Sequence, residues 1–199
     1  MAERLTVFRL PRVAGRLLAL ALLILSPAVA ASQRFAAEGE VEVLFTPRDE
    51  AEAALVSFIG EARHSIHVQS YIFTSKRIAD ALVAARQRGV DVQVLADGQM
   101  NRKAKGNALA VLLAAKVPVA METAYNAAHN KLILVDAEGP ACSVLTGSYN
   151  FTWSAQNRNA ENILILRGHC ALAKAYLANW QSHQRAATPL RSLPFSFKR

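Results

Sequence analysis

A histidine, a lysine, a serine and an asparagine fall in two short stretches whose spacing suits one phosphate site. His129 and Lys131 stand just before and at the start of an apolar run ending at Val135, which predicts a buried strand. Residues two apart in a strand face the same side, so both side chains can point into one site. The stretch Gly147-Ser148-Tyr149-Asn150 follows a second apolar run, and a strand that ends in Gly-Ser before a helix offers N–H, hydroxyl and amide donors to an anion. Together these residues predict a phosphate site with its own nucleophile.

The complete pattern is His129-x-Lys131-x4-Asp136 followed by Gly147-Ser148-x-Asn150. It resembles the HKD motif of the phospholipase D superfamily. The single copy in a short chain is most similar to the bacterial Nuc-type endonuclease branch, and Asn157 to Asn162, before another apolar strand, fits the same branch. This resemblance implies an α/β fold, an α/β/α sandwich with a mixed central sheet in a single domain.

The resemblance and the chemistry of phosphodiester cleavage assign each residue a role. His129 is the expected nucleophile, since imidazole can attack phosphorus and form a covalent phosphohistidine. Lys131 is the expected fixed charge on the phosphoryl oxygens, and Ser148 and Asn150 are expected to bind the substrate through neutral donors on the same oxygens. Glu161 opens the next strand and is the third expected catalytic residue, which orients the imidazole.

Two residues of the motif are expected to be structural, namely Gly147 and Asp136. Asp136 lies five strand residues beyond Lys131, a separation of about 16–17 Å at the usual rise per residue. It is therefore too far away for the same phosphate. We expect it to tie down a neighbouring loop.

The leaving group needs an acid, and one copy of the motif does not provide it. His64, His67, His169 and His183 all lack the accompanying lysine. The resemblance therefore implies a homodimer that shares one active site, in which two copies of His129 face each other across a two-fold axis. This scheme needs no metal and no other cofactor.

Several further side chains have two open interpretations. One basic stretch could contact a phosphate backbone or could form a solvated loop, and it contains Arg102, Lys103 and Lys105. Tyr149, Phe151 and Trp153 stack on bases or pack in the core, with core packing favoured for Phe151. Arg158 is a weaker phosphate-binding candidate.

The first 31 residues have the features of a secretory signal peptide. Four arginines precede the nine-residue apolar run Leu17–Leu25, and Ala28-Val29-Ala30 offers a cleavage site. An uncleaved anchor is the alternative, although a membrane span needs about 20 apolar residues. Cleavage predicts a periplasmic or secreted protein. Removal of residues 1–30 lowers the formal charge from +8 to +5, which still favours a polyanionic partner.

The chain contains two cysteines, Cys142 and Cys170. Export would place them in an oxidising compartment where a disulfide can form. Two interpretations stay open: a disulfide between neighbouring elements, or two buried free thiols.

Strand and helix patterns alternate from Val41 onwards, which is typical of an α/β sheet covered on both faces. We predict a signal peptide over residues 1–31, one catalytic domain over residues 32–187 and an irregular tail over residues 188–199. The leading functional hypothesis is an exported, metal-independent phosphodiesterase, a non-specific endonuclease that hydrolyses DNA or RNA. A phospholipase D acting on phospholipid headgroups is the first alternative, and a catalytically vestigial nucleic-acid-binding protein is the second.

Overall fold

The computed structural model describes residues 32–103 and 106–192. The predicted signal peptide and Lys105 lie outside these residues. The chain divides into two units, Met1–Arg34 and Phe35–Arg199, and every element described below belongs to the second unit. No helix in residues 32–103 and 106–192 is long and apolar enough to cross a membrane.

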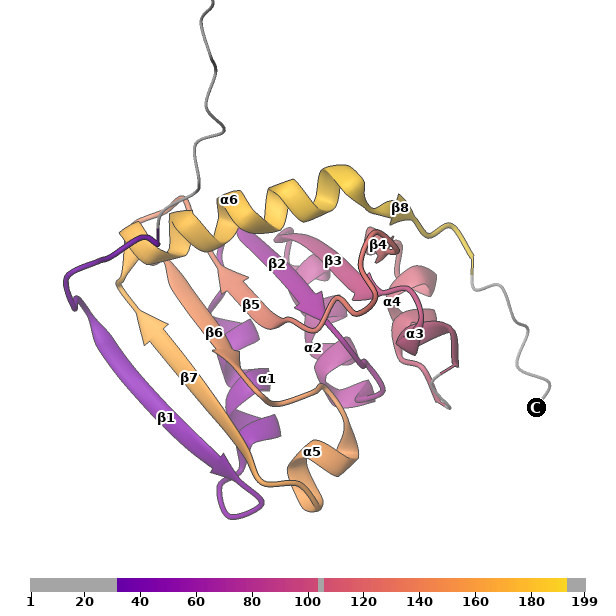
Figure 1. The fold of residues 1–199 in the computed structure, drawn as a ribbon, viewed down its shortest axis with the longest axis horizontal. Coiled ribbons are helices and arrows are strands. Elements are labelled where there is room, and N and C mark those ends of the chain that lie inside the picture. Colours follow the sequence, from indigo (N-terminus) through magenta and orange to yellow (C-terminus); the bar gives the residue numbers. More distant parts are fainter. Residues whose placement is uncertain (1–31, 104–105, 193–199) are drawn as a thin grey trace, which may run out of the picture. The chain divides into compact units, whose positions relative to one another are not determined.

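Strands and helices alternate along the chain (Figure 1). The elements are β1 Glu40–Thr46, α1 Ala51–Glu61, β2 Ser65–Ser70, α2 Lys76–Gln87, β3 Asp91–Asp97, α3 Met100–Lys103, α4 Leu109–Ala114, β4 Val119–Glu122, β5 Lys131–Val135, β6 Ser143–Gly147, α5 Trp153–Asn157, β7 Glu161–Arg167, α6 Cys170–Ala186 and β8 Thr188–Pro189.

The strands form one sheet in the order β1-β7-β6-β5-β2-β3-β4-β8. The pairs β2–β3 and β3–β4 are parallel, whereas β1–β7, β7–β6, β6–β5, β5–β2 and β4–β8 are antiparallel. Helices α1 and α2 cover one face, and α6 crosses the other (Figure 1). The predicted single α/β domain with a mixed central sheet is therefore confirmed.

Strand β5 is buried on both sides, which explains its uninterrupted apolar run. Ile133 and Val135 belong to the core beneath α1 and α2, while Leu132 and Leu134 belong to the core beneath α6. Lys131 is in phase with Ile133, so its side chain starts on the α1 and α2 side of the sheet. A central strand thus carries the predicted site to one end of the sheet.

Two local expectations differ from the structure. Arg102 and Lys103, for which a solvated loop was one interpretation, lie in the short helix α3. The tail expected to be irregular from residue 188 begins with β8, whose Thr188 and Pro189 pair with Met121 and Ala120. Tertiary pairing with β4 overrides the weak local preference of such a short Pro-containing segment.

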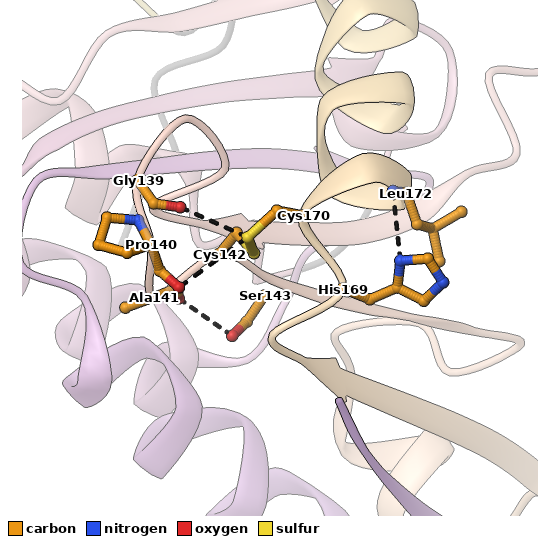
Figure 2. The surroundings of a disulfide bond; sticks show 8 residues. All are labelled: Gly139, Pro140, Ala141, Cys142, Ser143, His169, Cys170 and Leu172. Atoms are coloured by element: carbon orange, nitrogen blue, oxygen red, sulfur yellow. Dashed lines mark hydrogen bonds between the residues drawn. A yellow bond between two sulfur atoms is a disulfide. The ribbon is translucent and has the colours of Figure 1, made fainter. Parts of the chain in front are cut away.

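A disulfide joins Cys142 to Cys170, with 5.2 Å between the Cα atoms. Figure 2 shows it linking the residue before β6 to the first residue of α6. The two open alternatives are thereby resolved in favour of pairing. Because β6 runs from this bond towards Gly147, the disulfide lies at the end of the sheet opposite the predicted site.

Removal of this disulfide should destabilise the protein without touching the site. Cys142 and Cys170 are 28 residues apart, and a crosslink of that loop length is worth roughly 3–4 kcal/mol in the chain-entropy model. We expect the Cys142→Ala/Cys170→Ala variant to lose about this much stability in urea unfolding. Dithiothreitol should lower the midpoint for the wild type and leave the variant unchanged. A wild-type protein that is equally stable with and without dithiothreitol would contradict the prediction.

Candidate active site

Three neighbouring strands bring the predicted residues to one end of the sheet. Strand β5 starts at Lys131, β6 ends at Gly147 and β7 starts at Glu161. The register pairs Leu132 with Thr146, and Gly147 with Ile163. Residues distant in sequence therefore meet at one edge.

An aromatic ring links His129 and Lys131. Lys131 is buried, and its Nζ donates to the carbonyl oxygen of His129 at 2.7 Å. The same Nζ lies 4.8 Å from the centroid of the Tyr71 ring, and the Tyr71 and His129 rings are 4.4 Å apart, edge to face. His129 itself is exposed. Tyr71 thus restricts the orientation of an accessible imidazole and lies against the neighbouring cation.

The cation of Lys131 lies in a partly desolvated position. Burial lowers the pKa of its ammonium group to about 8, although the nearby negative charge of Glu161 acts in the opposite direction. Within the described residues no carboxylate forms an ion pair with Lys131. An anion bound at this point would stabilise the charged form.

Glu161 contacts Ser148 rather than His129. Ser148 Oγ donates to Glu161 Oε2 at 2.6 Å, and Asn159 Nδ2 donates to Glu161 Oε1 at 2.8 Å. Ser148 Oγ in turn accepts from the backbone N–H of Asn162 at 3.1 Å. In the described part of the chain no hydrogen bond joins Glu161 to the His129 ring. The carboxylate therefore fixes the hydroxyl of Ser148, and the expected contact with the imidazole is not made in this structure.

Gly147 allows β6 and β7 to approach at the site. Its φ is +154°, and a Cβ at this position would collide with the carbonyl oxygen of Asn162. The backbone N–H of Ser148 donates to that same oxygen at 3.0 Å. Glycine is needed here because any side chain would push Ser148 away from Glu161.

Asn150 lies two residues beyond Ser148 and is partly buried. Its Oδ1 is enclosed and has no hydrogen-bond partner among the described residues. A buried acceptor without a partner is unusual, and here it belongs to a residue predicted to bind substrate.

Asp136 lies at the other end of β5, away from the site. Its carboxylate accepts from three successive backbone N–H groups, those of Arg63 (2.9 Å), His64 (2.7 Å) and Ser65 (2.8 Å). It is buried and has a positive φ of 47°. It fixes the turn that leads into β2, so its contacts are with a loop rather than with the phosphate site.

Replacement of Asp136 should therefore affect stability. Asp136→Ala would leave three N–H groups without acceptors and place alanine at a positive φ, for an expected loss of roughly 2–4 kcal/mol. Asp136→Asn keeps one acceptor oxygen and tolerates that φ, so it should lose less. Urea unfolding measures both, with exposed Glu138→Ala as the control. Unfolding midpoints equal to that of the control would disprove this role.

Asp97 positions the segment that enters the site. Its Oδ2 accepts from the backbone N–H of Ala128 at 2.8 Å, one residue before His129. Its Oδ1 accepts from the backbone N–H groups of Gln99 and Met100 at 2.9 and 2.7 Å. The sequence interpretation missed Asp97 and Tyr71. Both follow or end parallel strands, but only their proximity to His129 shows their relevance.

The aromatic residues after Ser148 separate into two groups. Tyr149 and Phe151 are buried in the core, so base stacking is excluded for them in this structure. Trp153 is 58% exposed. Of the predicted basic loop, Arg102 lines a cleft of about 270 Å³ with Gly98, Gln99, Glu122, Thr123 and Tyr125.

The remaining histidines have contacts outside the site. The ring of His67 lies 4.6 Å from that of Trp180. His169 caps α6, accepting from the backbone N–H of Leu172 at 3.4 Å. His183 Nδ1 lies 2.6 Å from a carboxylate oxygen of Glu122. None of them lies beside His129 in the described contacts.

The sequence is similar to a known protein family and to several named proteins. The family model for the phospholipase D-like domain of cardiolipin synthase matches residues 55–183. A protein named phospholipase D from Rickettsia prowazekii is 40% identical over 144 residues, which cover 72% of this chain and 67% of that protein. Mitochondrial cardiolipin hydrolase of Drosophila melanogaster is 31% identical over 150 residues, which cover 67% of this chain and 58% of that protein.

The fold is also similar to a solved structure. Nuc from Salmonella typhimurium, a phospholipase D family member, superposes with a TM-score of 0.73 and 32% identity, covering 78% of this chain and all of that one. The range of the family match contains Tyr71, His129, Lys131, Ser148 and Glu161.

Proposed function

Because the chain belongs to the phospholipase D superfamily and is a phosphodiesterase of that family, we propose that it is an endonuclease that hydrolyses DNA or RNA without sequence preference. The predicted family resemblance and hydrolase activity are confirmed. The observation that supports this reaction most directly is the buried Lys131 cation beside the accessible imidazole of His129.

The proposed reaction has two steps. An imidazole nitrogen of His129 attacks phosphorus, a P–N bond forms, and the P–O bond to the leaving alkoxide breaks. In the second step a water molecule attacks phosphorus, a P–O bond forms, and the P–N bond breaks. Lys131 stabilises the charge on the phosphoryl oxygens in both steps. The single proton of the Ser148 hydroxyl is donated to Glu161 in this structure, so Ser148 positions that carboxylate at the site.

Both steps need a proton donor or acceptor besides the attacking imidazole. A second copy of the chain would supply its own His129, which gives a proton to the leaving alkoxide and later takes one from water. The proposed enzyme is therefore a homodimer with a shared site. The exposure of His129 leaves room for this second ring.

A nucleic acid substrate is favoured by charge. Without residues 1–30 the chain carries 19 Lys and Arg against 14 Asp and Glu, and this positive balance attracts a polyanion. The N-terminal signal peptide pattern supports export, and we propose that the protein acts in the periplasm or outside the cell.

Phospholipid is the second candidate substrate. Relatives named phospholipase D and mitochondrial cardiolipin hydrolase are 40% and 31% identical to this chain. The phosphodiester chemistry is the same for both substrates, so the reacting residues alone do not separate them.

A direct comparison of substrates tests the proposal. The purified protein is incubated with plasmid DNA and, separately, with vesicles of phosphatidylcholine or cardiolipin, all in EDTA. We expect DNA degradation that is lost in His129→Ala. Headgroup release without DNA cleavage would transfer the assignment to a lipase, and a requirement for added Mg²⁺ would contradict the covalent histidine mechanism.

A further inference from the structure

The short helix α5 and the residue that follows it, Arg158, place an indole and a guanidinium together on the surface. Trp153 is 58% exposed, and Arg158 Cζ lies 5.0 Å from the centroid of its ring. Arg158 covers one side of the indole, and the high exposure of Trp153 shows that much of the ring remains uncovered. An aromatic face beside a cation suits a planar base attached to a phosphate backbone.

The helix that carries Trp153 is held against the rest of the fold. Gln156 Nε2 donates to the carbonyl oxygen of Asp49 at 2.9 Å, and Gln156 Oε1 accepts from the backbone N–H of Glu52 at 2.9 Å. Thr152 Oγ1 caps the helix by accepting from the N–H of Ala155, whose side chain is buried. The indole is therefore presented by a fixed helix, so little ordering is needed on binding.

The same helix is joined to the candidate active site at both ends. It lies in the segment between Ser148 and Glu161, which are hydrogen-bonded to each other at 2.6 Å. Directly after Arg158, Asn159 Nδ2 donates to the other oxygen of Glu161 at 2.8 Å. Trp153 and Arg158 therefore lie in the segment that leaves the candidate site at Ser148 and returns to it at Glu161.

We propose that Trp153 and Arg158 form a binding subsite for the nucleotide next to the scissile phosphate. The base stacks on the uncovered part of the indole, and Arg158 faces the adjoining backbone phosphate. This inference rests on the proposed nuclease function and deepens it. An indole face can also bind the quaternary ammonium of a choline headgroup, but the adjacent Arg158 cation repels it, so the subsite favours nucleic acid.

An oligonucleotide with bases and one without bases separate the roles. Cleavage of a single-stranded thymidine oligomer is compared with cleavage of an abasic tetrahydrofuran oligomer of equal length. Stacking on an aromatic side chain is worth about 5- to 150-fold in binding. Trp153→Ala should lower kcat/KM by about this factor for the thymidine oligomer and leave the abasic oligomer unchanged, while Trp153→Phe should restore most of the loss.

Arg158 is tested through the salt dependence. Arg158→Gln should weaken binding of both oligomers and reduce the slope of log affinity against log salt by about 1, because one phosphate contact is lost. Phe35→Ala and Arg86→Gln are matched controls. Phe35 stacks edge-on against His169, and Arg86 pairs with Asp91 at the start of β3, so both lie away from the site end of the strands.

Three results would overturn the inference. If Trp153→Ala cleaves the thymidine oligomer at the wild-type rate, the proposed subsite is wrong, while the proposed nuclease function still stands. Equal losses on both oligomers, together with dissociation of the dimer in sedimentation, would assign Trp153 to a protein interface. A wild-type protein that cleaves neither oligomer would defeat the subsite and the proposed function together.

Discussion

His129→Ala should reduce phosphodiesterase activity by about 10³-fold or more. General acid–base catalysis by one positioned side chain alone contributes ~10²–10⁴-fold, and this change also removes the atom that forms the covalent intermediate. The loss should appear in kcat, measured on DNA in EDTA, with unchanged thermal stability because the side chain is exposed. His64→Ala is the matched control, since His64 is also exposed but lies by Asp136 at the opposite end of the sheet.

The same variant distinguishes a shared site from a self-contained one. Wild type and His129→Ala are unfolded together, refolded in equal amounts and assayed. If two subunits share one site, only wild-type pairs are active, and activity falls to about a quarter of that of the same total of wild type. An activity of one half would show that each subunit works alone and would contradict the shared site. Failure to trap a phosphohistidine on either subunit of the wild type would contradict the covalent mechanism.

Loss of the Lys131 charge should have the second largest effect. Lys131→Gln keeps a side chain of similar length but removes the cation from the phosphoryl oxygens, and removal of one preorganised donor lowers kcat by about 10²–10³-fold. Exposed Lys174→Gln on α6 should leave activity unchanged. Nearly full activity of Lys131→Gln would exclude this lysine from charge stabilisation.

The pH profile gives an independent reading of the same residue. Burial lowers the pKa of Lys131 to about 8, so in the free enzyme the cation is lost as the pH rises through this value. We therefore expect kcat/KM to fall on the alkaline side with a midpoint near 8. In Lys131→Arg the guanidinium stays charged, and this alkaline decline should disappear even if the maximum is lower. A decline that persists in Lys131→Arg would assign it to another group.

The phosphate-site residues are distant in sequence, yet their pattern alone predicted that they would meet. Alternating strand and helix patterns predicted an α/β sheet covered on both faces, because periodicity records which faces are buried. The mixed strand directions were implied by the family resemblance. The apolar run of β5 predicted a central strand, and that strand does place Lys131 at the edge where β6 ends and β7 begins. The separation along the strand also correctly predicted that Asp136 would be remote from the site and bound to a loop.

The sequence pattern could not predict which side chains from separate strands and helices would contact one another. Tyr71 reaches His129 only because β2 pairs with β5, which sets Ser70 opposite Lys131. Glu161 was expected to orient the imidazole of His129. Instead, β6 and β7 approach closely at Gly147, and the Ser148 hydroxyl donates a hydrogen bond to the Glu161 carboxylate. The order of strands in a sheet is decided by long-range packing, which no local pattern encodes.

The sequence by itself determined the fold class and the family, since both follow from residue types at a characteristic spacing. Only the tertiary structure decided that Cys142 and Cys170 pair, that Tyr149 and Phe151 are core residues, and that Trp153 is exposed beside Arg158. An alternating aromatic pattern is the same for a buried and an exposed ring. The difference arises from what packs against each ring, and those neighbours come from other parts of the chain.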